Sequence, residues 1–383
     1  MKAPFHIVLV GPYPVSPDCI RGGVEASVCG LSQELAKTLM VEVMDMPRMG
    51  GVDAIENDGN LTIYRYVNQG VHNQDAAKRI PDIVSAIANL QPDVVHIHGT
   101  GLISAHLYRA LRSRGIKTIV TVHGLLEVEK RNALKKHISL KGIYQYIIQT
   151  MTERWLLNRC SKVIVDTAYV AAAIRKYRLR HVPLMHVIPQ GINEHYYDLR
   201  CSETSKTILS VGSISKRKGH LLLVGAFEKA CERGLDAHLQ IFGVVAEQTY
   251  CDALLQRVAA SPYRERIRVT LNASQAELDK AYSAAHLFAL HTEEESQGIV
   301  FAEAMAAGLP VVSTRVGGVP YVVQDGECGL LSDYGDVENF ADNLCELMKD
   351  EKKWQAMSVK AKQMAKNYNW TEIADKVKKV YGE

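Results

Sequence analysis

Short apolar runs alternate with longer amphipathic stretches along most of this chain. A continuous apolar run is typical of a strand buried on both faces, and a helical repeat of apolar positions is typical of a surface helix. Strands are predicted at residues 5–10, 41–46, 61–67, 93–98, 117–123, 162–167, 186–189, 207–211, 236–243, 267–271, 287–291 and 310–314. Helices are predicted from about residue 24, at 75–90, up to 114, at 127–160, at 299–307, twice within 336–367 and at 369–383. This alternation indicates an α/β protein with doubly wound parallel sheets, which bind ligands at the carboxyl ends of their strands.

The length and one polar segment predict two domains. A chain of 383 residues exceeds the usual size of a single core. Residues 201–207, CSETSKT, form a polar connector, and the strand at 207–211 begins the alternation again. We therefore expect one domain over residues 1–200 and a second over residues 201–367.

Composition narrows the class of protein. The apolar fraction is 47%, the charged fraction is 23% and the net charge is +3, which suits a soluble globular protein and is too small a charge to indicate nucleic-acid binding. The eight cysteines show no metal-binding spacing and are expected as reduced thiols. The N-terminal apolar run ends at Gly11-Pro12 and is expected to be a first strand rather than a signal peptide, and no apolar run is long enough to cross a bilayer. A cytoplasmic protein is therefore expected.

Residues 285–331 carry the clearest chemical signal. Gly298, followed by Ile299 and Val300, is predicted to present backbone N–H groups at a helix N-terminus, where the helix dipole favours a phosphate. The carboxylates Glu295 and Glu303 flank this position, and because a phosphate would repel them they are better suited to accept hydrogen bonds from hydroxyl groups. A diphosphate with a sugar hydroxyl on one side and a ribose hydroxyl on the other describes a nucleotide sugar.

The segment from Glu295 through SQGIVFAEAMAAGLPVV, with seven residues between Glu295 and Glu303, resembles the signature of the retaining nucleotide-sugar glycosyltransferases of the GT-B fold, the group 1 or family four glycosyltransferases. The resemblance implies two Rossmann-like domains that face a central cleft, with the acceptor in the first and the donor in the second. It also implies that the final helix, residues 368–383, packs back on the first domain. Gln297 stands where this family usually has phenylalanine.

The resemblance assigns donor-binding roles to the second domain. Lys218, in a Lys-Gly pair, would neutralise the donor diphosphate; the arginine usual in this loop is Ser213 here, and Arg217 or Lys216 would supply the missing charge. The loop at Asn272 would contact the base through its backbone, which leaves a UDP or a GDP donor equally open.

Gly22 and Gly23 in the first domain would close over the donor diphosphate by the same resemblance. His123 matches the family's histidine beside the donor sugar and is, with Glu295, a candidate catalytic residue. His98 also ends a predicted strand and is a candidate on the acceptor side, whereas His96 is expected to lie inside its strand as a structural residue.

The predicted helical segment 127–160 begins with Lys130, Arg131, Lys135, Lys136, His137 and Lys141 and continues with an apolar, aromatic portion. One interpretation is a solvated face beside a core-packed helix. The other is contact with an anionic membrane surface or with a lipid-diphosphate acceptor.

The family resemblance implies a retaining hexosyltransferase that uses a glycan or lipid-linked acceptor in bacterial surface polysaccharide synthesis, as in lipopolysaccharide or capsule, at the cytoplasmic face of the inner membrane. No Asp-x-Asp motif stands where a metal would bridge the diphosphate, so no metal and no cofactor beyond the nucleotide sugar are expected. A non-catalytic nucleotide-sugar-binding subunit, and an epimerase or phosphorylase of the same fold, remain alternatives.

Overall fold

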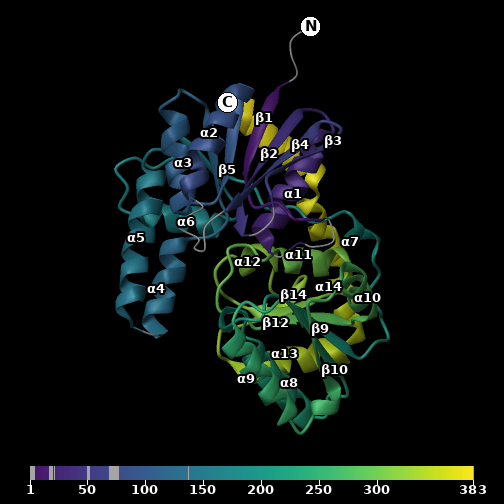
Figure 1. Cartoon of the computed structure of the whole chain (residues 1–383). Coiled ribbons are helices and arrows are strands. Elements are labelled where there is room, and N and C mark those ends of the chain that lie inside the picture. The colour runs from purple at the N-terminus through teal and green to yellow at the C-terminus, as the bar shows by residue number, and fades with distance from the viewer. Residues whose placement is uncertain are drawn as a thin grey trace. The chain divides into compact units, whose positions relative to one another are not determined.

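The computed structural model describes residues 5–16, 20, 22–49, 52–68, 77–136 and 138–382. The chain forms two compact units, and each has its own sheet (Figure 1). The first unit comprises Met1–Val15, Gly23–Gln190 and Trp370–Glu383, and the second comprises Ser16–Gly22 and Gly191–Asn369. The main division therefore falls after Gln190, before the polar connector at residues 201–207.

The first unit is built on an eight-stranded sheet in the order β3-β4-β2-β1-β5-β6-β7-β8. Its strands are β1 (His6–Gly11), β2 (Met40–Met49), β3 (Ala54–Asp58), β4 (Leu61–Asn68), β5 (Val94–His98), β6 (Thr118–Val122), β7 (Lys162–Val165) and β8 (Leu184–Val187). All neighbouring strands are parallel except β3, which pairs antiparallel with β4 at the edge. The sequence analysis missed β3, because its segment AIEND has a single large apolar residue, Ile55, which is exposed.

Helices cover both faces of this sheet, as the alternation predicts. They are α1 (Gly23–Ala36), α2 (Ile80–Leu90), α3 (Leu102–Arg112), α4 (Leu126–Lys136), α5 (Leu140–Leu157), α6 (Ala168–Lys176) and α15 (Trp370–Gly382). One apolar core lies under α2, α3 and α6, and a second lies under α1 and α15. The last helix contacts α1, where a Cβ on Gly30 would meet the Trp370 indole at 2.2 Å, so only glycine fits there.

The second unit has a six-stranded, all-parallel sheet in the order β11-β10-β9-β12-β13-β14. The strands are β9 (Thr207–Val211), β10 (His238–Gly243), β11 (Ile267–Leu271), β12 (Leu287–Leu290), β13 (Val311–Thr314) and β14 (Gly329–Ser332). The helices are α7 (His195–Asp198), α8 (His220–Glu232), α9 (Gln248–Ala259), α10 (Gln275–Ala284), α11 (Ile299–Ala306), α12 (Val319–Val322), α13 (Val337–Lys349) and α14 (Glu351–Ala365). Two apolar cores on its two faces complete a doubly wound unit.

The predicted helical segment 127–160 is a pair of helices, α4 and α5, that pack against each other. The interpretation of α5 as a core-packed helix is wrong for its first three turns, where Leu140, Ile143, Tyr144, Ile147 and Met151 are exposed. Among the described residues, no helix is long and apolar enough to cross a membrane.

Candidate donor site and histidine cluster

The stretch that carries the phosphate signal folds as the sequence predicts. Strand β12 leads into an irregular loop, Gly298 is the residue before helix α11, and strand β13 follows. Gly298 has φ +79, a left-handed conformation in which a side chain is strained, and a Cβ there would meet the Phe301 ring at 2.7 Å. The N–H groups of Ile299 and Val300 lie in the first turn of α11, where an α-helix has no carbonyl of its own to accept them. They are therefore available to an anion.

A buried ion pair joins the loop before this helix to the 3-10 turn Lys216–Lys218 that precedes α8. The Lys218 ammonium contacts the Glu295 carboxylate, and the Arg217 guanidinium lies 3.5 Å from the other Glu295 oxygen. Thr292 Oγ1 donates to the first oxygen at 3.1 Å. Lys218 is 8% exposed and Glu295 is 5% exposed, so both charges depend on this contact. The structure thus brings together Lys218, Arg217 and Glu295, which the sequence predicted separately. It adds Thr292, which was not predicted.

Burial and ion pairing act in opposite directions on these two groups. Burial by itself raises the pKa of the Glu295 carboxyl, but the positive charges of Lys218 and Arg217 outweigh it and lower that pKa below the ordinary value. Burial lowers the pKa of the Lys218 ammonium, and Glu295 opposes the shift. Glu295 is therefore an anion at neutral pH, and it holds Lys218 as a cation inside the second unit.

Three glycines allow the loop to fold this tightly: Gly219, which belongs to the predicted Lys-Gly pair, and Gly317 and Gly318, which were not predicted. A Cβ on Gly219 would lie 1.8 Å from the His291 carbonyl oxygen, one on Gly317 would lie 2.2 Å from that of Glu295, and one on Gly318 would lie 1.8 Å from that of Ser296. The Gly318 N–H also donates to the Glu295 carbonyl at 2.7 Å. Glycine is needed at each of these positions because a backbone carbonyl from a distant segment leaves no room for a Cβ.

Glu303 is partly buried on α11 and accepts a hydrogen bond from the Tyr282 hydroxyl at 3.1 Å. Burial raises the pKa of its carboxyl to about 7, against the weaker lowering effects of Tyr282 and Lys218. Tyr282, on α10, is a second neighbour that the sequence analysis missed. A carboxyl group with a pKa near neutrality is often found at a functional site. The role of Glu303 as the ribose contact stays a prediction.

Asn272 follows strand β11 and has φ +54, which is uncommon for a residue with a side chain. Its N–H donates to the carbonyl of Gly243 at 3.0 Å. The loop therefore has a fixed backbone at the carboxyl end of the strand, as a backbone-mediated base contact requires.

The first unit contains a cluster of buried histidines at the carboxyl ends of β5 and β6. His98 Nδ1 and His123 Nε2 are 2.9 Å apart and share a hydrogen bond. His96 is bonded to the Tyr381 hydroxyl at 2.7 Å and to Thr121 at 2.6 Å, so its interpretation as a structural residue is confirmed. Burial lowers the pKa of His98 far below its usual range, with further lowering from His96 and His123. His98 is therefore neutral, and it contacts His123.

Asp166 and Gln190 extend this cluster, and neither was among the predicted site residues. The Asp166 carboxylate lies 3.5 Å from His123 Nδ1 and accepts a hydrogen bond from the Gln190 amide at 2.6 Å. Asp166 is 2% exposed, and its other oxygen has no hydrogen-bond partner among the described residues. His123 thus lies between a carboxylate and a neutral imidazole, with one of these groups near each ring nitrogen.

Gly22 and Gly23 lie at the start of α1, which begins at Gly23. A Cβ on Gly22 would meet no atom of the described residues within 4 Å. The described structure therefore gives no steric reason for glycine at position 22, and closure of this loop over a donor stays a prediction.

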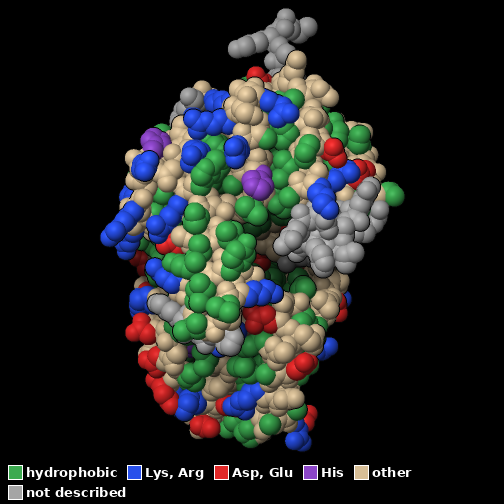
Figure 2. Space-filling model, turned by 60° about the vertical axis from the view of Figure 1, so that its left-hand side comes forward, with side chains coloured by type: hydrophobic (Ala, Val, Ile, Leu, Met, Phe, Trp, Pro, Cys, Tyr) green, Lys and Arg blue, Asp and Glu red, His purple; other side chains and the backbone are tan. Residues whose placement is uncertain are grey.

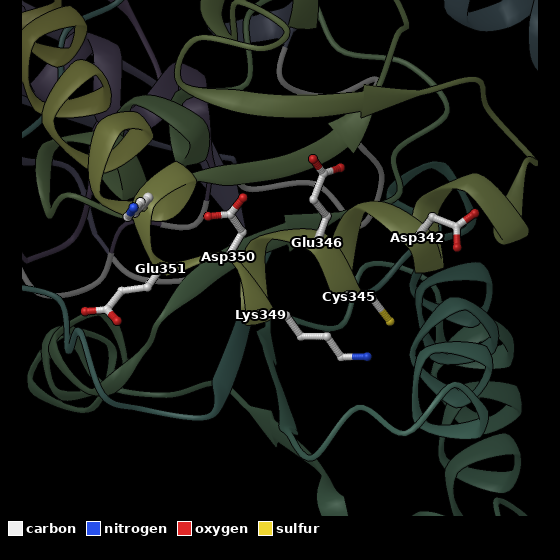
Figure 3. A pocket seen from close by; sticks show the side chains of 7 residues that line it. Asp342, Cys345, Glu346, Lys349, Asp350 and Glu351 are labelled. Carbon is white, nitrogen blue, oxygen red and sulfur yellow. The ribbon is translucent and has the colours of Figure 1, made fainter.

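A separate surface depression lies beside α13 and the start of α14. It is lined by Asp342, Cys345, Glu346, Lys349, Asp350 and Glu351, which are charged apart from Cys345 (Figure 3). None of the predicted site residues lines it, and its carboxylates would repel a diphosphate. The residues around α11 therefore stay the candidate donor site.

Two family models match the chain, one to each half. Residues 194–364 match the model described as Glycosyl transferases group 1, and residues 21–196 match the model described as Glycosyltransferase Family 4. Together the matches extend over residues 21–364 and include every predicted site residue.

The chain is also similar to characterised proteins. It is 26% identical to the D-inositol 3-phosphate glycosyltransferase of Corynebacterium diphtheriae, over 94% of this chain and 90% of that protein. It is 28% identical to the N-acetyl-alpha-D-glucosaminyl L-malate synthase of Bacillus anthracis, over 71% of this chain and 69% of the relative.

Solved structures share the fold at lower identity. Sucrose-phosphate synthase from Thermosynechococcus elongatus superposes with a TM-score of 0.83 at 20% identity over 98% of both chains. HepE of Anabaena, in complex with UDP-glucose, superposes with a TM-score of 0.75 at 17% identity over 98% of this chain and 99% of that one. These likenesses establish a GT-B fold.

Proposed function

Because the chain belongs to the group 1 and family 4 glycosyltransferases, we propose that it transfers a hexosyl unit from a nucleotide diphosphate sugar with retention of configuration. The proposed acceptor is a glycan or lipid-linked saccharide of a bacterial surface polysaccharide, reached at the cytoplasmic face of the membrane. A solved structure with the same fold holds UDP-glucose, which supports a nucleoside diphosphate sugar as the donor class.

The observation that carries this proposal is the contact of Lys218 and Arg217, from the 3-10 turn before α8, with the buried Glu295 in the loop before helix α11. Two cations and the N-terminus of that helix come from one unit, and together they provide positive potential for a diphosphate. An ammonium group has three donors, and its contact with Glu295 uses one, so Lys218 can also donate to a phosphate oxygen. No metal or cofactor is required for this charge balance.

In this proposal Glu303 contacts one end of the donor and Glu295 contacts the other. Glu303 lies on α11 beside Tyr282 and accepts the ribose hydroxyls once it has lost its proton. Glu295 lies on the loop before α11 and accepts a hydroxyl of the transferred sugar while it keeps Lys218 charged. Both carboxylates act by orientation and charge rather than as nucleophiles.

His123 is proposed to contact the transferred sugar from the first unit. His98 lies at Nε2 of its ring and Asp166 lies 3.5 Å from Nδ1, so a hydrogen bond from His123 to the sugar would replace one of these two contacts. The leaving diphosphate is proposed to accept the acceptor's proton as the acceptor oxygen attacks the face of the sugar from which the diphosphate departs. This step retains configuration without an enzymic nucleophile.

A ligand screen tests the proposed donor class. Thermal unfolding is measured with UDP-, GDP- and ADP-sugars and with the matching nucleoside monophosphates, because a ligand that prefers the native state raises the midpoint. We expect a rise with one family of diphosphate sugars, and slow hydrolysis of the same sugar nucleotide. The proposal is wrong if no sugar nucleotide raises the midpoint or is hydrolysed, and slow hydrolysis also excludes a non-catalytic subunit.

We predict that transfer continues in excess EDTA. The reason is that Lys218, Arg217 and the α11 dipole already supply the positive charge that a metal would bring to the diphosphate. The measurement is the initial rate with and without chelator, followed by addition of Mg²⁺ or Mn²⁺. Loss of activity with recovery on adding the metal would contradict it.

A further inference from the structure

Helix α5 exposes an apolar stripe. Leu140, Ile143, Tyr144, Ile147 and Met151 recur at the helical period, so they fall on one side of the helix. Their exposed fractions run from 38% for Ile143 to 88% for Leu140, and Ile138, just before the helix, is 78% exposed. In Figure 1 α4 and α5 lie side by side as a hairpin of the first unit, and Figure 2 turns this side of the molecule forward and shows a band of hydrophobic side chains.

The C-terminal part of α5 is packed into the first unit by both polar and apolar contacts. Glu153 is fully buried and accepts hydrogen bonds from Thr100 at 2.8 Å, from Tyr177 at 3.1 Å and from the backbone of residues 126 and 127. Its neighbour Arg154 makes a two-pronged contact with Glu127 of α4, at 2.7 and 2.8 Å. A surface helix ordinarily turns its apolar side inward. Helix α5 follows this rule only at its C-terminal end, where Leu156 and Leu157 lie in the apolar core, whereas the apolar stripe that begins at Leu140 is exposed.

The residues around the turn of the hairpin are basic, whereas Glu127 and Glu129 lie at the start of α4. Between residues 130 and 141 the sequence holds six basic side chains and no acidic one, and no acidic residue occurs from there to Glu153. Arg131 and Lys141 are exposed on the described part of this hairpin. An apolar helix face with basic residues at its end suits an anionic bilayer, in which apolar side chains enter the boundary of the acyl chains and the cations contact the headgroups.

We propose that the α4–α5 hairpin docks the protein on an anionic membrane surface through the stripe of Leu140, Ile143, Tyr144, Ile147 and Met151. This inference rests on the proposed function, because docking would bring the first unit to a lipid-linked acceptor. The docking itself is independent of donor chemistry, so it can be tested without any sugar nucleotide. In this proposal the apolar side chains make the main contact with the membrane, and the basic residues make a smaller contribution.

The test compares sedimentation with vesicles of phosphatidylglycerol and phosphatidylcholine in equal parts. The variant Ile143→Asn/Ile147→Asn/Met151→Asn should lower the partition coefficient about tenfold or more, because the stripe no longer gains from leaving water. A matched control replaces three equally exposed apolar residues of the same unit, Ile55→Asn, Val182→Asn and Leu184→Asn, whose exposed fractions are 62%, 45% and 60%. The control should sediment like the unaltered protein.

A charge variant separates the two contributions to binding. Arg131→Glu/Lys141→Glu should weaken binding to anionic vesicles and leave the weaker binding to pure phosphatidylcholine unchanged. Equal sedimentation of the unaltered protein and the stripe variant would overturn the proposal. So would a dimer, seen by sedimentation velocity without lipid, that the same three substitutions dissociate, because a second copy would then cover the stripe. Thermal stabilisation by a sugar nucleotide should persist in every variant, so failure of docking and failure of the proposed donor class give different results.

Discussion

Replacing Lys218 by methionine should destabilise the second unit by about 3 to 5 kcal/mol and abolish measurable transfer. The substitution leaves the Glu295 carboxylate, 5% exposed, without its main partner in a site that excludes water. Differential scanning calorimetry should show one transition move down by roughly 6 to 20 °C for a unit of this size. Transfer should fall because the diphosphate loses its buried cation.

A double variant separates these two effects. In Lys218→Met/Glu295→Gln no buried charge remains unpaired, so most of the lost stability should return while transfer stays absent. The control Lys229→Met breaks an exposed lysine–glutamate pair of the same unit and should leave the thermal transition almost unmoved. If the single and double variants are equally unstable, the Lys218–Glu295 contact is not what holds this loop.

Replacing Glu303 by glutamine should weaken nucleoside diphosphate binding at pH 8 by about 1.5 to 3 kcal/mol, roughly 10- to 150-fold. Burial holds the pKa of the Glu303 carboxyl at about 7, so the carboxylate that accepts the ribose hydroxyls becomes populated as the pH rises through 7. Calorimetric titrations between pH 6 and pH 8 should show affinity that rises with pH in the unaltered protein. Glu303→Gln should keep only the dependence that comes from the ligand's own protonation near pH 6.

The same pKa makes a prediction about stability. The folded protein holds the Glu303 proton up to about pH 7, whereas an unfolded chain releases it near the ordinary value of 4.5. The native state therefore binds more protons in that interval, and this residue's contribution to the free energy of unfolding falls as the pH rises from 4.5 to 7. Tyr282→Phe removes a hydrogen bond that lowers the pKa and should move the binding profile to higher pH. A binding profile unchanged by both substitutions would remove Glu303 from the site.

Local signals in the sequence were sufficient to predict helix α11 and the glycine before it. Gly298, the apolar helix after it and Gly308, which follows the end of that helix with φ +89, lie close together in the sequence, and each acts within a turn or two of the backbone. For that reason α11 and the strands around it lie where the pattern predicts them. The edge strand β3 gave no such signal, because one antiparallel neighbour and solvent demand little of its side chains.

The sequence by itself determined the α/β alternation, the two doubly wound sheets, the family and the separate members of the donor site. Tertiary structure alone decided that Lys218 and Glu295, 77 positions apart, form one buried pair, and that Asp166 lies beside His123. It also decided that the apolar side of α5 faces outward. Periodicity fixes which residues share a face of a helix or strand, but burial depends on what distant segments cover that face, and burial sets the cost of a charge.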